Sequence, residues 1–301
     1  MILTLWTEID NFNGYLRYER RLSPHTVLAY LTDLKQLADY LETTYDIQDG
    51  PAIAAIHLRS WLSEMKGQGM GNRSLKRKIA ALNTFFQYLM AQGKMNANPA
   101  RHLLLPKVDK PLPKFLSEKQ TENLVDEWPP DDDFDAWTQH LVIELLYQTG
   151  MRRAELLGLK MKDIDEARGQ IQVFGKGGKM RLVPLNDSLL KYLRHYFELK
   201  NNKFVLPVEN VLSLESGKAL YPQYVYRTVK RYLAVVTTLD KKSPHVLRHT
   251  FASQLLNNGA DLMAIKELLG HQSLAATQVY THLNIERLKD VYQKAHPKAG
   301  K

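Results

Sequence analysis

Residues 170–185 read QIQVFGKGGKMRLVPL and differ from the rest of the chain, whose apolar residues mostly recur at helical spacing. The runs 171–174 and 182–183 are rich in β-branched and large apolar residues, and a glycine-rich turn separates them. Two short runs around such a turn predict a β-hairpin. We therefore expect a mainly α-helical protein with a small antiparallel sheet in its larger, C-terminal domain.

Helical patterns lie on both sides of this hairpin. Residues 23–41 begin with a Ser-Pro pair, which suits an N-cap and first helical position, and continue with apolar residues at helical spacing. A second helix is expected from about Ser74. The apolar-periodic run 136–149 ends at Gly150, and the chain after Tyr221 has helical patterns again.

Four prolines between residues 99 and 113, interspersed with lysines, indicate an interdomain connector. A length of 301 residues also suggests two domains. We expect an N-terminal helical domain over residues 1–105, a linker over 106–114 and a C-terminal domain over 115–301.

Composition narrows the class of protein. The chain has no cysteine, which excludes disulfides, a thiol nucleophile and cysteine-ligated metals. No apolar run approaches the ~18 residues of a membrane span, and the first ten residues lack the basic start of a signal peptide. We expect a soluble, cytoplasmic protein. A formal charge of +9 favours an anionic partner, with nucleic acid the leading candidate.

The positive charge is unevenly placed along the chain. Residues 65–108 hold eight Lys or Arg and no acid, whereas residues 1–64 hold five basic and nine acidic residues. Such a one-sided stretch suits contact with a phosphate backbone. The candidate DNA-binding residues are Lys66, Arg73, Lys76, Arg77 and Lys78. The alternative is a solvated helix face.

The glycine-rich turn is not a phosphate-binding P-loop. That motif needs Ser or Thr after its lysine, but Met180 follows Lys179. Lys176 at the turn is a candidate functional lysine, or simply a solvated charge. His245 and His249 are four residues apart, but Val246 replaces the glutamate of a metalloprotease helix, so we expect no metal site.

Two other segments place basic groups together. His245 and Arg248 are three residues apart, so they project from one face of a helix that suits an anionic oxygen. Arg152 follows Gly150, and Glu155 is positioned to brace it through a charge-assisted hydrogen bond. For each segment the alternative is an ordinary surface or capped helix.

Taken together, these segments resemble the tyrosine recombinases, the phage-integrase family, and more narrowly the Xer recombinases. The motifs are TGMRRAEL at 149–156, GKGGK at 175–179, HVLRHTFA at 245–252, LLGH at 268–271 and VYTH at 279–282. The stretch LSPHTVLAYLTDL at 22–34 also resembles the Xer DNA-clamping (SAM-like) domain. Residues 197–221 fit the family pattern loosely, and we assign no function to them.

The resemblance implies a set of catalytic residues. These are Arg152, Lys176, His245, Arg248, His271 and the nucleophile Tyr280, with Glu155 supporting. It implies DNA cleavage and rejoining through a 3′-phosphotyrosine and a Holliday junction, without metal, ATP or other cofactor. Arginine forks would grip the nonbridging phosphate oxygens, Lys176 would protonate the 5′ leaving oxygen, and His245 and His271 would assist.

The resemblance also implies partners and a cellular role. The partners are double-stranded DNA with a specific site, further recombinase subunits in a tetramer (this chain or a second Xer protein) and the FtsK DNA translocase. The expected role is resolution of chromosome dimers for segregation at cell division. The alternatives are an integrase or transposon recombinase with the same chemistry, and a noncatalytic DNA-binding relative. An amphipathic helix beyond Asn284 is expected to dock on a neighbouring subunit or to fold back on its own domain.

Overall fold

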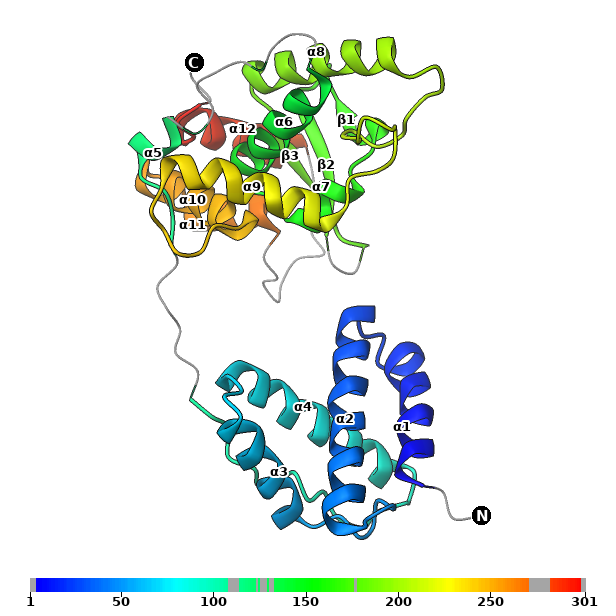
Figure 1. The fold of residues 1–301 in the computed structure, drawn as a ribbon. Coiled ribbons are helices and arrows are strands. Elements are labelled where there is room, and N and C mark those ends of the chain that lie inside the picture. Colours follow the sequence, from blue (N-terminus) through cyan, green and yellow to red (C-terminus); the bar gives the residue numbers. More distant parts are fainter. Residues whose placement is uncertain are drawn as a thin grey trace. The chain divides into compact units, whose positions relative to one another are not determined.

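The computed structural model describes residues 4–107, 114–122, 124, 129, 133–175, 178–270 and 282–298 (Figure 1). The chain divides into two compact units, Met1–Pro111 and Leu112–Lys301. The division falls inside the segment expected to be a linker. Each unit has a hydrophobic core of its own.

In its described residues the first unit consists of helices and the turns that connect them, without a strand. Its helices are α1 (Leu5–Gly14), continued by a π-helical turn (Tyr15–Glu19), α2 (Pro24–Tyr45), α3 (Ala55–Gly67) and α4 (Asn72–Ala91). The expected N-cap of α2 is present, since the Ser23 hydroxyl accepts a hydrogen bond from the Thr26 backbone N–H at 3.2 Å. Aromatic side chains pack against one another in its core, where the rings of Phe12 and Phe85 meet edge to face.

The second unit surrounds one buried helix, α6 (Phe134–Thr149), with α5 (Glu118–Glu122) preceding it. Helices α8 (Asp187–Lys203), α9 (Pro222–Val236) and α10 (Pro244–Asn257) pack against α6, which is why most residues of α6 are buried. The remaining helices are α7 (Arg153–Gly158), α11 (Leu262–Leu269) and α12 (His282–Ala295). The expectation of a mainly helical fold with one small sheet is confirmed.

The sheet has three antiparallel strands in the order β1 (Ile164–Asp165), β2 (Gln170–Phe174) and β3 (Met180–Pro184). The predicted hairpin is β2–β3, in register with Val173 opposite Arg181 and Ile171 opposite Val183. All four of these residues are buried. β1 follows a 3-10 turn (Met161–Asp163) and was not predicted, because a two-residue strand is too short to show an alternating pattern.

Helix α12 packs within its own unit, against α10, α11 and β3. Leu288 and Tyr292 are 2% and 1% exposed. The C-terminal end of α12 is also held, since Asn258 donates to the carbonyl of Ala295 at 2.7 Å. In the single chain α12 thus folds back on its own domain, and docking on a neighbouring subunit stays a prediction for the assembled protein.

Candidate active site

The site is built where α6 ends. Gly150 terminates this helix with a φ of +59°, a left-handed conformation that side chains disfavour. A Cβ at this position would lie 2.5 Å from the ring of Phe251 on α10 and 2.9 Å from Leu269 on α11. Glycine therefore lets three helices meet closely, and the chain turns directly into Arg152.

Arg152 and Glu155 hold each other at the start of α7. The Glu155 carboxylate accepts the Arg152 backbone N–H at 2.7 Å and its Nη1 at 2.8 Å. The contact expected between these residues is thus present. Burial would by itself raise the pKa of Glu155, but hydrogen bonds and charge from Arg181, then Arg152, hold it below its ordinary value. Glu155 is therefore an ionised, buried carboxylate.

Arg248 on α10 lies against the same turn. Its Nη1 donates to the carbonyl of Gly150 at 2.5 Å, and its Nη2 donates to the carbonyl of Leu269 at 2.6 Å. The residue is only 7% exposed. Burial, and then the positive charges of Arg152 and Arg181, lower the pKa of Arg248 to about 10. Arg248 still carries its charge at neutral pH, so the site is strongly electropositive.

A third arginine, Arg181 on β3, completes this cluster and was missed by reasoning from the sequence. Its guanidinium binds both Glu155 oxygens, at 3.0 and 2.8 Å, and its Nε donates to the carbonyl of Leu268 at 2.7 Å. The alternation of side chains along a strand could have identified it, because residue 181 lies on the same inward face of β3 as Val183. An arginine at an inward position requires a carboxylate partner.

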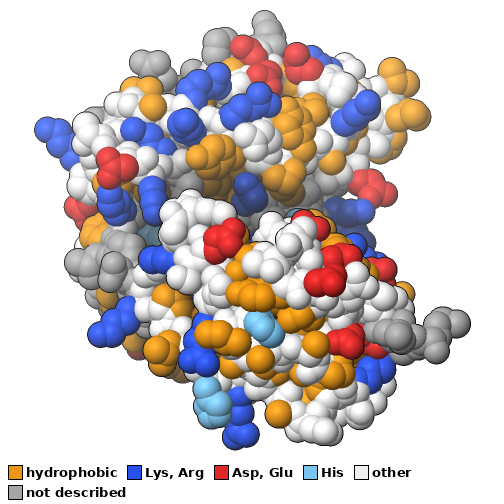
Figure 2. Space-filling view, turned by 60° about the horizontal axis from the view of Figure 1, so that its bottom comes forward, with side chains coloured by type: hydrophobic (Ala, Val, Ile, Leu, Met, Phe, Trp, Pro, Cys, Tyr) orange, Lys and Arg blue, Asp and Glu red, His pale blue; other side chains and the backbone are white. Residues whose placement is uncertain are grey.

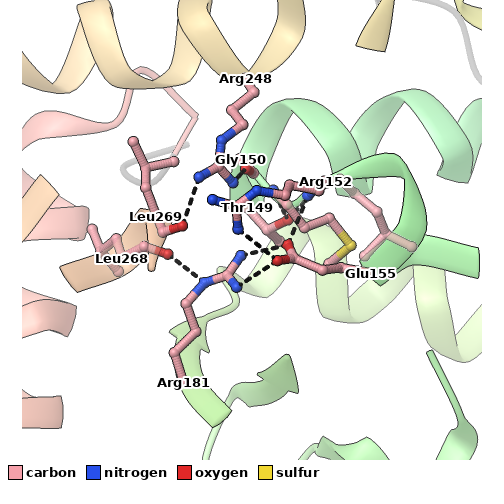
Figure 3. A network of polar contacts seen from close by, with 10 residues as sticks. Thr149, Gly150, Arg152, Glu155, Arg181, Arg248, Leu268 and Leu269 are labelled. Atoms are coloured by element: carbon pink, nitrogen blue, oxygen red, sulfur yellow. Dashed lines mark hydrogen bonds and ion pairs between the residues drawn. The ribbon is translucent and has the colours of Figure 1, made fainter. Parts of the chain in front are cut away.

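Figure 3 shows these residues as one network. The guanidinium groups of Arg152 and Arg181 bind the carboxylate of Glu155, and that of Arg248 binds the nearby carbonyls of Gly150 and Leu269. Contacts to the ends of α6 and α11 join the network to the fold. Positive charge exceeds negative charge in this cluster, so it can bind an oxyanion.

His245 lies one turn before Arg248 and is exposed. Partial desolvation, followed by the positive charges of His249, Arg248, Arg153 and Arg152, lowers the pKa of His245 below its ordinary value. The imidazole is therefore neutral at pH 7 and can accept a proton. The other expected catalytic residues, Lys176, His271 and Tyr280, lie outside the described residues, and their roles stay predictions.

The five candidate DNA-binding residues occupy different environments. Lys66, at the end of α3, and Arg73 and Lys76, in the first turns of α4, are exposed. Arg77 is half-buried, pairing with Asp33 at 2.7 Å and donating to the carbonyl of Ala29.

The assignment of Lys78 to DNA contact is wrong. Its side chain is 1% exposed, and its ammonium pairs with buried Asp33 at 2.9 Å and lies over the ring of Trp61. A buried ammonium needs such a partner, so Lys78 contributes to the core of its unit and not to a DNA-binding surface.

In the space-filling view of Figure 2, lysine and arginine side chains are visible on both units.

The described part of the chain was also searched for metal-binding clusters and membrane-spanning helices. No group of three or more His, Asp or Glu there is placed to hold a metal ion. No helix there is both long and apolar enough to cross a membrane.

Comparison with known families identifies both units. The phage integrase family matches residues 114–287, and the N-terminal SAM-like domain of phage integrases matches residues 9–93. Together these matches show that the chain belongs to the phage integrase family, the tyrosine recombinases.

Individual relatives show which tyrosine recombinases the chain is similar to. The chain is 35% identical to tyrosine recombinase XerC of Chlorobaculum parvum, over 97% of this chain and 94% of that protein. It is 38% identical to XerC of Alcanivorax borkumensis, over 97% and 94%. The resemblance to Xer recombinases expected from the motifs is confirmed.

Solved structures share the fold. XerH recombinase bound to palindromic difH substrate matches with a TM-score of 0.71 and 24% identity, over 96% of this chain and 84% of that one. A lambda integrase dimer bound to a COC′ core site matches with a TM-score of 0.69 and 19% identity, over 92% and 98%.

Proposed function

We propose that this protein is a site-specific DNA recombinase that cuts and rejoins DNA strands through a covalent 3′-phosphotyrosine at Tyr280. The observation that carries the proposal is the arginine cluster of the second unit. Arg152 is held by Glu155 at the start of α7, and Arg248 on α10 donates to the carbonyl of Gly150, two residues before Arg152. This arrangement suits a phosphodiester whose negative charge must be neutralised during attack.

The reaction is a transesterification. The Tyr280 oxygen attacks the scissile phosphorus, the bond from phosphorus to the 5′ oxygen breaks, and one phosphodiester replaces another. His245, neutral at pH 7, accepts the tyrosine proton, and Lys176 protonates the leaving 5′ oxygen. Arg152 and Arg248 bind the nonbridging oxygens, with His271 as a further donor. Because bond energy is retained in the phosphotyrosine, resealing needs no ATP.

The first unit contributes DNA binding through the exposed residues Lys66, Arg73 and Lys76. The N-cap position of α4 is Gly71, which provides no side-chain hydrogen bond to the first turn, and that turn contains no acid. Backbone N–H groups at such a helix end favour a phosphate. The acid-free stretch 65–108 is therefore the proposed DNA-facing part of this unit.

The cellular role we propose is resolution of chromosome dimers at cell division, by recombinase subunits assembled as a tetramer on a specific site and passing through a Holliday junction. The relatives named XerC support a Xer-type role, and the solved lambda integrase tetramer bound to a Holliday junction supports the assembly. The proposal includes a cytoplasmic location and FtsK as a further partner. The second candidate is a mobile-element integrase, favoured by the fold shared with lambda integrase.

The test is trapping of the covalent intermediate on a nicked suicide substrate that carries the selected target site. Wild-type protein should form an adduct in the presence of EDTA, and Tyr280→Phe should bind the same DNA without forming it. Tyr226→Phe, on α9, is a matched control that should retain the adduct. An adduct with Tyr280→Phe would exclude our nucleophile, and a strict Mg²⁺ requirement would exclude the mechanism.

A further inference from the structure

Arg181 has no role in the reaction outlined above, yet it is the most buried arginine of the cluster. Its side chain is 3% exposed, against 38% for that of Arg152. It lies on β3, opposite Val173 of β2, at a position that faces the interior. A guanidinium in this environment must have all its contacts provided by the fold.

Those contacts are shared with Arg152 through a single carboxylate. Glu155 Oε1 accepts Nη1 of Arg181 at 3.0 Å and Nη1 of Arg152 at 2.8 Å. Glu155 Oε2 accepts Nη2 of Arg181 at 2.8 Å and the backbone N–H of Arg152 at 2.7 Å. Because the Arg181 fork binds both oxygens, it fixes the plane of the carboxylate, which in turn orients both the main chain and side chain of Arg152.

Arg181 also balances the buried charge of Glu155. The carboxylate is 4% exposed on its side chain and would be costly to ionise without a buried cation. With Arg181 as the buried partner, the positive charge of the more exposed Arg152 remains available to an anion from solvent. Removal of Arg181 would leave Arg152 as the principal counterion of Glu155.

The remaining nitrogen of the Arg181 guanidinium, Nε, joins α11 to this arrangement. Its Nε binds the carbonyl of Leu268, and the next carbonyl, that of Leu269, binds Arg248. A Cβ on Gly270 would lie 3.2 Å from Cδ of Arg181, so the glycine allows this close approach. Arg181 and Arg248 therefore hold consecutive carbonyls at the C-terminal end of one helix, where cations are favoured.

We propose that Arg181 is a positioning residue for phosphate binding, which orients Arg152 through Glu155 and aligns it with Arg248 through the end of α11. This inference rests on the proposed function, since the phosphate is that of the cleaved DNA strand. Arg181 itself contacts no reacting atom. Its effect on the reaction passes through Arg152.

A double-mutant cycle tests whether Arg181 acts on the reaction through Arg152. The single-turnover rate of covalent adduct formation is measured for Arg181→Met, Arg152→Ala and the double variant, with saturating suicide substrate. Arg181→Met should slow the reaction by about 10- to 100-fold, the effect of a small displacement of a catalytic group. In the Arg152→Ala background the same substitution should slow it by less than about 3-fold, because Arg181 acts through the residue already removed. DNA affinity should stay within about 2-fold of wild type.

Two further variants separate positioning from folding. Arg181→Lys keeps a cation beside Glu155, so it should fold, but it lacks the fork and should still be slowed. Lys200→Met removes a buried cation of the same unit that binds the carbonyls of Val208 and Val211, away from the cluster. It should lower the thermal unfolding midpoint while leaving the rate of adduct formation unchanged.

The outcomes are distinct. Equal losses from Arg181→Met with and without Arg152, or a wild-type rate for folded Arg181→Lys and Arg181→Met, would overturn the positioning role alone. A wild-type rate for Arg152→Ala would overturn both this inference and the proposed phosphate binding. A loss that depends on Arg152, with normal DNA affinity, would establish the role.

Discussion

Arg152 and Arg248 differ in how they are held, although both are assigned to the same phosphate. Arg248 is buried and anchored to two backbone carbonyls, whereas the Arg152 side chain is 38% exposed and anchored to Glu155. The first residue therefore contributes to the folded structure as well as to the site. The second can change its contacts when an anion arrives.

This difference predicts separable effects of Arg152→Lys and Arg248→Lys. Both should lower the rate of adduct formation by about 10²- to 10³-fold, as expected for loss of an oriented donor to a developing charge. Only Arg248→Lys should also lower the thermal unfolding midpoint, because a lysine cannot bind both the Gly150 and Leu269 carbonyls in the same geometry. Arg194→Lys, on the exposed side of α8, is the matched control. Near-normal activity of either site variant would contradict its assignment to the phosphate.

Individual residues also mark the limit of prediction from the sequence. Arg152 with Glu155, and His245 with Arg248, were singled out because each pair lies within one helical turn, and the resemblance to the tyrosine recombinases then implied their roles. Lys78 was misassigned because its buried ion-pair partner, Asp33, is 45 residues away in the sequence. Arg181 was missed for the same reason, since Glu155 is 26 residues away and in another element.

At the level of elements, α4 is the proposed DNA-binding helix of the first unit. Replacing Arg73 and Lys76 with alanine should weaken DNA binding and reduce the slope of log K against log salt, by up to about 0.9 for each phosphate that the variant no longer neutralises. Arg77 is excluded from the test because its pairing with Asp33 would confound stability with binding. Lys35→Ala, an exposed lysine of α2 outside the acid-free stretch, is the control. An unchanged slope would identify the exposed end of α4 as an ordinary solvated surface.

We expect the segment after α12 to make stability depend on pH. The ring of His296 stacks on Tyr292 and lies near Tyr147 and Phe251. Burial, and then the nearby charge of Lys298, lowers the pKa of His296 to about 3. The folded protein therefore keeps this imidazole neutral where the unfolded chain, with an ordinary pKa near 6.5, takes up a proton.

The sign of the pH effect follows from this difference. Stability from a neutral His296 is fully present above about pH 6.5 and is lost as pH falls toward 3, by at most about 1.4 kcal/mol for each pH unit. His296→Gln should reduce the fall in unfolding free energy between pH 7 and pH 5, measured by urea denaturation. His25→Gln, in the first unit, is the control. An identical pH dependence in wild type and His296→Gln would show that another group controls acid stability.

Helices and strands with a clear local signal in the sequence, such as a regular spacing of apolar residues, were predicted, and those without one were not. α2, α6 and the β2–β3 hairpin each carry a cap, a glycine or a repeated apolar spacing that acts locally. β1 carries none of these, because it is two residues long and is defined by pairing with β2. The position of α12 on its own unit also depends on tertiary packing, since its apolar face fits either a neighbour or its own core.

At the scale of the whole molecule, the two units have separate cores joined by a proline-rich connector. We expect each to remain folded when the connector is cut, because no core residue of one unit belongs to the core of the other in the described part of the chain. If both units bind DNA, the connector raises the effective concentration of the second unit once the first is bound.

Cutting the connector should therefore weaken DNA binding without unfolding either unit. A specific protease site inserted between residues 111 and 112 allows the comparison within one protein, before and after cleavage. Circular dichroism should be unchanged, while affinity for a full target site should fall by about 10²- to 10⁴-fold, the usual range for loss of linked binding. The uncut insertion variant is the control for the insertion itself. Unchanged affinity after cleavage would mean that one unit alone carries the binding, and loss of helical signal would mean that the units depend on each other to fold.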